Sequence, residues 1–152
     1  MIAIGDKMPF FEVVNQDDLK VNSEELKGQK LILFFYPKDD TPGCTAEACS
    51  LRDGFSDLTN LGYTLFGVSP DLPNKHRKFI DKHNLPFTLL ADSEHKMMED
   101  FGVWGEKSMY GKKYMGVLRT TVVIDENGIV SHVVTKVKTK EHSTQLLNLL
   151  SN

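Results

Sequence analysis

The feature that most constrains the fold is a run of six apolar residues, Leu31–Tyr36, followed closely by turn residues and then by a helical pattern. An unbroken apolar run of this length is typical of a strand that is buried on both faces. Pro42 and Gly43 supply the turn, and the residues from Thr45 onward suit a helix. A buried strand that leads into a helix is the building unit of an α/β protein.

Strand and helix patterns alternate along the rest of the chain. The predicted strands are Phe10–Val14 and Leu19–Val21 in one hairpin, Tyr63–Val68, Phe87–Ala91, and Thr120–Ile124 and Ile129–Val134 in a second hairpin that turns at Asn127-Gly128. Five helices are predicted. The first is short, with Asn22 and Glu25 as its capping residues and Gly28 as its end, and the second follows Cys44 and ends at Gly62. The third begins at Pro73 and ends before Asn84, the fourth is His95–Phe101, and Thr139 caps the last. The glycine-rich segment Val103–Gly116 has weak periodicity and is predicted to be a long, functional loop.

This order of elements predicts an α/β fold in which helices cover both faces of a central mixed β-sheet. It resembles a thioredoxin-like fold with an N-terminal β-hairpin extension. A chain of 152 residues is expected to form a single domain, residues 1–152.

The composition excludes several classes of function. A net charge of −3 gives no electrostatic basis for binding nucleic acid or an anionic membrane. No apolar stretch approaches the roughly 20 residues of a membrane helix, and the first residues lack the basic and long apolar regions of a signal peptide. Two cysteines are too few for a secreted disulfide scaffold. We therefore expect a cytoplasmic protein whose cysteines rest as thiols.

Cys44 lies at or next to the start of its predicted helix. Unpaired backbone N–H groups and the positive end of the helix dipole favour the thiolate there, and the thiolate is the nucleophilic form. Thr41 offers a hydroxyl three residues before the sulfur, and Cys49 is a potential partner five residues after it. The alternative is an inert buried cysteine, since Cys44 also lies on the apolar stripe of the helix.

Two motifs make a resemblance specific. The pattern Pro37-x-x-x-Thr41-x-x-Cys44 matches the active-site motif of the peroxiredoxins. The longer segments 35–49, 101–107 and 110–121 resemble the peroxiredoxin Q (bacterioferritin comigratory protein) subfamily, so that the likeness spans essentially the whole chain.

The resemblance implies a role for each matching residue. Cys44 would be the peroxidatic cysteine and Cys49 the resolving cysteine, which together form an intramolecular disulfide. Thr41 and Arg119 would be polar partners of the sulfur, and Pro42 would shield the sulfur from solvent. The implied enzyme is a thioredoxin-dependent peroxidase that reduces hydrogen peroxide and organic hydroperoxides without metal, haem or flavin, as a monomer or a weak homodimer.

Other side chains have two interpretations each. Without the motif, Arg119 would be interpreted as a solvated charge at a strand end. Glu47 either complements the helix dipole from the first turn or orders Arg119. The aromatic residues of the predicted loop, Trp104, Tyr110 and Tyr114, either form a docking surface for a reductant or anchor the loop by packing.

Three rival functions remain open on the sequence alone. A thiol–disulfide oxidoreductase of thioredoxin type needs two residues between its cysteines, and four lie between Cys44 and Cys49. A zinc site would need finger-like spacing of histidines, and His76 and His83 are about 10 Å apart along one helix. A non-enzymatic binding module leaves the cluster around Cys44 unexplained.

Overall fold

A computed structural model describes residues 1–151, and a seven-stranded mixed sheet forms its centre. The strand order is β2-β1-β5-β4-β3-β8-β9, in which β3, β4 and β5 are parallel and the other neighbours are antiparallel. The strands are β1 (Glu12–Asn15), β2 (Lys20–Asn22), β3 (Lys30–Phe35), β4 (Tyr63–Ser69), β5 (Thr88–Ala91), β8 (Thr120–Ile124) and β9 (Val130–Val134). The mixed sheet and its flanking helices confirm the predicted thioredoxin-like α/β fold, and the N-terminal hairpin joins the sheet edge through β5.

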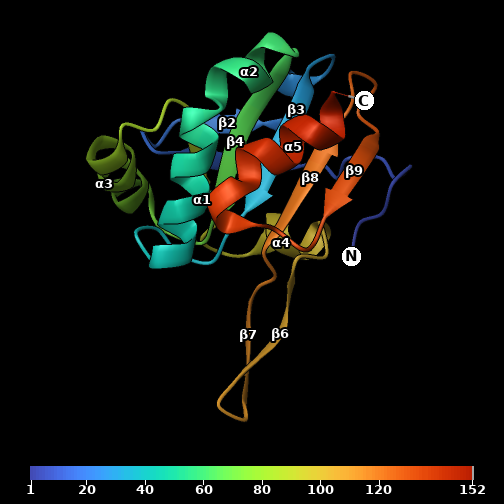
Figure 1. The fold of residues 1–152 in the computed structure, drawn as a ribbon. Helices are drawn as coiled ribbons and strands as arrows, with labels where there is room; N and C mark the ends of the chain where they lie inside the picture. Colours follow the sequence, from blue (N-terminus) through green and yellow to red (C-terminus); the bar gives the residue numbers. More distant parts are fainter. Residues whose placement is uncertain (152) are drawn as a thin grey trace.

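The helices lie on the two faces of this sheet. They are α1 (Pro42–Asp53), α2 (Phe55–Asn60), α3 (Pro73–His83), α4 (Lys96–Asp100) and α5 (His142–Leu150), with 3-10 turns at Ser23–Leu26 and Thr139–Glu141. Figure 1 shows α1, α2 and α5 together in front of the sheet, while α4 lies behind its lower end. Glycine is required between α1 and α2, because a Cβ at Gly54 would lie 2.5 Å from the Cβ of Ser143 in α5.

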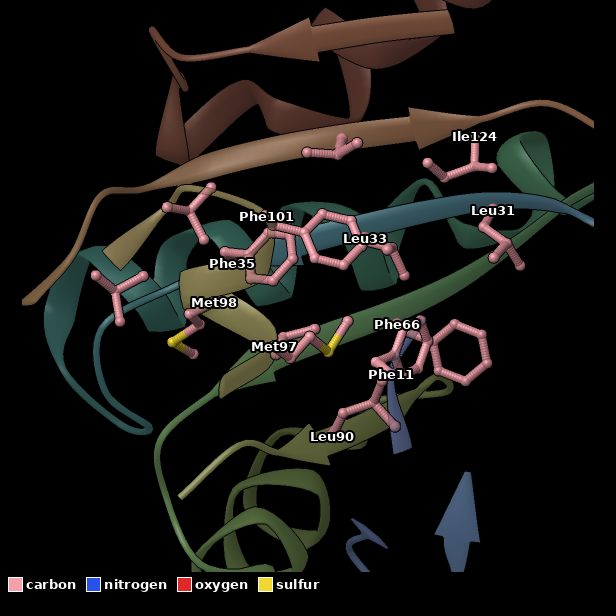
Figure 2. Packing of buried hydrophobic residues seen from close by; sticks show 14 of the residues in the cluster. Phe11, Leu31, Leu33, Phe35, Phe66, Leu90, Met97, Met98, Phe101 and Ile124 are labelled. Carbon is pink, nitrogen blue, oxygen red and sulfur yellow. The ribbon is translucent and has the colours of Figure 1, made fainter. Parts of the chain in front are cut away.

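Strand β3 divides the core into two clusters because its side chains alternate between the faces of the sheet. Leu31, Leu33 and Phe35 point to one face, where Figure 2 shows them among the buried side chains of the other strands and of α4. The other face holds Ile32 and Phe34 with residues of α1, α2, α3 and α5. Cys44 belongs to this second cluster, so its helix is held against the sheet by apolar packing.

The prediction of a long loop at residues 103–116 is wrong. Strands β6 (Trp104–Met109) and β7 (Lys112–Val117) form a separate two-stranded hairpin there, which projects from the body of the molecule in Figure 1. Its turn consists of Tyr110 and Gly111, with φ values of 52° and 79°. Two successive residues with positive φ form the type of two-residue turn that matches the twist of paired strands.

Three details at helix ends also differ from prediction. Asn22 does cap the first short helix, but its side chain accepts from the backbone N–H of Glu24, and the element is a 3-10 turn. Thr139 begins a 3-10 turn and does not cap α5. The helix that follows Cys44 ends at Asp53, and α2 continues the path to Asn60. Within residues 1–151, no helix has the length and apolar character that crossing a bilayer requires.

Candidate active site

Cys44 is the third residue of α1, where the loop after β3 delivers the chain to the helix start. Thr41 is the N-cap in extended conformation and Pro42 occupies the first helical position. Proline suits that position because its missing N–H would have no helical partner. The predicted position of Cys44 at the start of its helix is confirmed. The first backbone N–H groups of a helix lack helical partners and favour an anion nearby.

The sulfur of Cys44 lies against Arg119. The guanidinium Nη2 is 3.2 Å from Sγ, and only 2% of Cys44 is exposed. Arg119 comes from the short connection between β7 and β8, so the sheet order brings it to the start of α1. It is therefore a partner of the sulfur and not a solvated strand-end charge. Burial lowers the pKa of Arg119, but the neighbouring Glu47 and Cys44 raise it by more. The pKa therefore lies above its ordinary value, and the side chain stays a cation.

Glu47 holds Arg119 from the opposite side. Its Oε1 accepts from Arg119 Nη1 at 2.5 Å, and its side chain is fully buried. It lies beyond the first turn of α1, so the interpretation as a first-turn partner of the helix dipole is wrong, and the ordering of Arg119 is what the geometry supports. Burial raises the pKa of Glu47 to about 7, although Arg119 opposes this shift.

His142 closes the far side of this cluster, and no pattern in the sequence marked it as a site residue. Its Nε2 lies 2.7 Å from Thr121 Oγ1 and 3.6 Å from Glu47 Oε2, and its Nδ1 lies 2.9 Å from Gln145 Oε1. Burial lowers the pKa of His142, which favours the neutral ring. Within residues 1–151, Oε2 of Glu47 has no hydrogen-bond partner, which is consistent with a raised affinity of this carboxyl for a proton.

The other predicted site residues lie close by with different contacts. The hydroxyl of Thr41 donates to the Lys38 carbonyl at 2.8 Å, which fixes the loop and leaves the hydroxyl oxygen free to accept. Pro42 is exposed, and the burial of Cys44 comes from the apolar cluster under α1. Cys49 is half-buried on the same helix, and both cysteines are free thiols.

The aromatic residues of the hairpin have separate roles. Trp104 stacks on His95 with ring centroids 3.8 Å apart, so it anchors the hairpin to the body. Tyr110 is 99% exposed at the turn, and Tyr114 is also exposed. These two side chains remain candidates for a docking surface.

Comparisons with known proteins agree on one family. A model of the AhpC/TSA family matches residues 4–133. The chain is 46% identical over 151 residues to peroxiredoxin Bcp of Bacillus subtilis, covering 99% of this chain and 96% of that protein. It is 44% identical over 149 residues to peroxiredoxin Bcp of Escherichia coli, covering 98% of this chain and 96% of the relative.

Solved structures show the same similarity in three dimensions. A mutant of Xylella fastidiosa PrxQ superposes with a TM-score of 0.92 at 28% identity, covering 99% of this chain and 96% of that one. The bacterioferritin comigratory protein of Xanthomonas campestris, studied as trapped intermediate and ligand complexes for its alkyl peroxide reduction, superposes with a TM-score of 0.86 at 30% identity, covering 93% and 90% of the two chains.

Proposed function

The chain belongs to the AhpC/TSA family as a peroxiredoxin of the Bcp and PrxQ group, and we propose that it reduces hydrogen peroxide and organic hydroperoxides through Cys44. A peroxidase activity is common to this group, and the substrate classes are the part we propose. The alkyl peroxide reduction of the Xanthomonas campestris relative supports organic hydroperoxides. The single observation that carries the role of Cys44 is its contact with Arg119 at 3.2 Å.

In the first step the thiolate of Cys44 attacks one peroxide oxygen. The O–O bond breaks, the sulfur becomes a sulfenic acid, and the leaving oxygen takes a proton to depart as water or an alcohol. Arg119 stabilises this step because a guanidinium keeps its charge and donates several N–H groups to the oxygen on which negative charge develops. Thr41 lies at the helix start with its hydroxyl oxygen available to accept from the protonated peroxide oxygen. Shielding of the sulfur by Pro42 remains a prediction.

In the second step Cys49 attacks the sulfur of the sulfenic acid. Water leaves, and an intramolecular disulfide joins Cys44 to Cys49. A dithiol protein then attacks this disulfide, supplies two electrons and two protons, and restores both thiols. We propose thioredoxin as that reductant and the cytoplasm as the location, because thiol systems there keep cysteines reduced.

A coupled assay tests this cycle. Peroxide consumption with thioredoxin and its reductase is measured for the wild type, Cys44→Ser and Cys49→Ser. We expect full activity only in the wild type, no reaction in Cys44→Ser, and a single turnover in Cys49→Ser. Turnover by Cys44→Ser would contradict the role of Cys44, and wild-type turnover by a small thiol but not by thioredoxin would contradict the proposed reductant.

A further inference from the structure

A second buried polar cluster lies beside the active-site loop and takes no part in the steps above. His76 of α3 is fully buried and has a partner on each ring nitrogen. Its Nε2 lies 2.9 Å from the Leu90 carbonyl, and its Nδ1 lies 2.6 Å from Asp39 Oδ2. Asp39 is also buried, and it sits in the loop that joins β3 to α1.

The partners fix where the protons must be. A carbonyl oxygen can only accept, so Nε2 of His76 carries a proton. Tyr36 donates its hydroxyl to Asp39 Oδ1 at 2.5 Å. Burial raises the pKa of Tyr36 well above its ordinary value, and the nearby charge of Asp39 adds to this effect. The Tyr36 hydroxyl therefore stays protonated. One further proton must lie between Nδ1 and Oδ2, because two bare acceptors 2.6 Å apart would repel each other.

The same loop is held at two more points. The backbone N–H of Asp39 donates to Asp71 Oδ2 at 2.7 Å, and Ser69 at the end of β4 donates to the same oxygen at 2.6 Å. Asp40 adopts φ of 61° and contacts Lys82 and His83 of α3 on the surface. Exposed pairs of this kind are screened by solvent and contribute little to stability, so the buried contacts of Asp39 dominate.

We propose that Asp39 and His76 share one buried proton and act as positioning residues that fix loop 38–41. Thr41 ends this loop at the N-cap position of α1, so the position of Asp39 sets where the first turn presents Cys44 to Arg119. The inference rests on Cys44 as the residue that reacts with peroxide. It assigns to α3 the placement of the active-site loop, a role that none of the peroxidase steps requires.

The test compares two reactions of the same sulfur. In a Cys49→Ser background, the rate constants of Cys44 with hydrogen peroxide and with iodoacetamide are measured for Asp39→Ala, Asp39→Asn and Asp40→Asn. The peroxide reaction depends on the aligned Arg119 and Thr41, whereas alkylation depends mainly on the thiolate. We expect Asp39→Ala to lower the ratio of the peroxide rate constant to the iodoacetamide rate constant about 10- to 100-fold, since small misplacements of catalytic groups slow a reaction by that much.

Two variants provide matched controls. Asp39→Asn can accept from Tyr36 and donate to a neutral His76 Nδ1, so we expect it to restore the ratio to within about threefold of the parent. Asp40→Asn keeps the left-handed backbone and loses only surface pairs, so we expect a ratio near that of the parent. An unchanged ratio in a folded Asp39→Ala protein overturns the inference. If that variant does not fold, Tyr36→Phe replaces it, with a smaller drop expected and no drop contradicting the inference.

Two further measurements test the network, and the second distinguishes a shared proton from a bound metal ion. Nitrogen NMR of the reduced wild type is expected to show a protonated Nε2 on His76, and a bare Nε2 would contradict the network. Ligand atoms of Asp39, Asp71 and His76 lie within 4.8 Å of one another, so metal content is measured as well. Stoichiometric zinc in the wild type that is absent from Asp39→Asn would show that a metal ion occupies the place of the shared proton. That result would overturn the proposal. Failure of the parent to form any sulfenic acid would instead contradict the proposed function.

Discussion

Nη2 of Arg119 lies 3.2 Å from Sγ of Cys44, while Nη1 of the same guanidinium binds Glu47 at 2.5 Å. One cation therefore faces two acidic groups. When Glu47 is protonated, the charge of Arg119 is available to the sulfur alone. When Glu47 is ionised, the two anions compete for it, so the affinity of Glu47 for its proton bears on the chemistry at Cys44.

Replacement of Arg119 should slow the first step. Arg119→Gln removes the charge that stabilises the thiolate and the leaving oxygen, and we expect the single-turnover rate with peroxide to fall about 100-fold or more. Arg119→Lys keeps the charge but loses the fork of donors, so its rate should lie between those of the wild type and Arg119→Gln. Stopped-flow measurement checks this, with Arg77→Gln as a surface control. A rate in Arg119→Gln that matches the control would remove Arg119 from the mechanism.

Glu47 should make stability depend on pH in a defined direction. Burial raises its pKa from 4.5 to about 7. Between these values the folded protein holds a proton that the unfolded chain has released, so stability should fall as pH rises through this window, by roughly 3 kcal/mol in total from this group. Glu47→Gln removes this contribution, and we expect its stability relative to the wild type to be greater at about pH 8 than at about pH 5.

Urea unfolding of both proteins at the two pH values checks this prediction. His142 contributes in the opposite direction, because burial lowers its pKa and stability is lost as pH falls below its ordinary value. Because Nε2 of His142 lies 3.6 Å from Glu47 Oε2, both proteins are also compared in a His142→Gln background, where that contribution is absent and the difference isolates Glu47. A difference in stability that does not change with pH would show that Glu47 has the same proton affinity in both states.

Formation of the disulfide should open the start of α1. Cys44 and Cys49 are both in the helix, where a spacing of five residues places their Cα atoms roughly 8.5 Å apart and their side chains about 140° apart around the axis. A disulfide needs a Cα separation below about 7 Å. We expect amide exchange between Thr41 and Arg52 to be much faster in the oxidised protein. Equal protection in both states would mean that the disulfide forms without unwinding.

The sequence was sufficient for elements whose burial pattern is local. The apolar run of β3, the stripe of α1 and the Asn127-Gly128 turn each carry their own signal. The structure places the strand and the hairpin as predicted, and the stripe faces the core, although Gly54 divides its helix in two. The hairpin β6–β7 carries no such burial pattern, because both of its faces are largely open and apolar residues do not alternate along it. Its one available signal was the turn at Tyr110 and Gly111.

The environment of Glu47 could not be predicted from its neighbours in sequence. Arg119 is 72 residues away and His142 is 95 residues away, and only the order of the strands and the packing of α5 bring them to α1. An acidic residue near a helix start is usually solvated, so local reasoning favoured the wrong interpretation. Long-range pairing of buried charges is decided by topology, which the sequence pattern indicates only in outline.

The most direct test of the central claim is to trap the first oxidation product. Reduced Cys49→Ser protein is treated with one equivalent of hydrogen peroxide in the presence of a sulfenic-acid probe, and the labelled peptide is identified by mass spectrometry. We predict one label, on Cys44, and a Cys44–Cys49 disulfide without label in the wild type. A label at any other residue, or none while peroxide is consumed, would contradict Cys44 as the nucleophile.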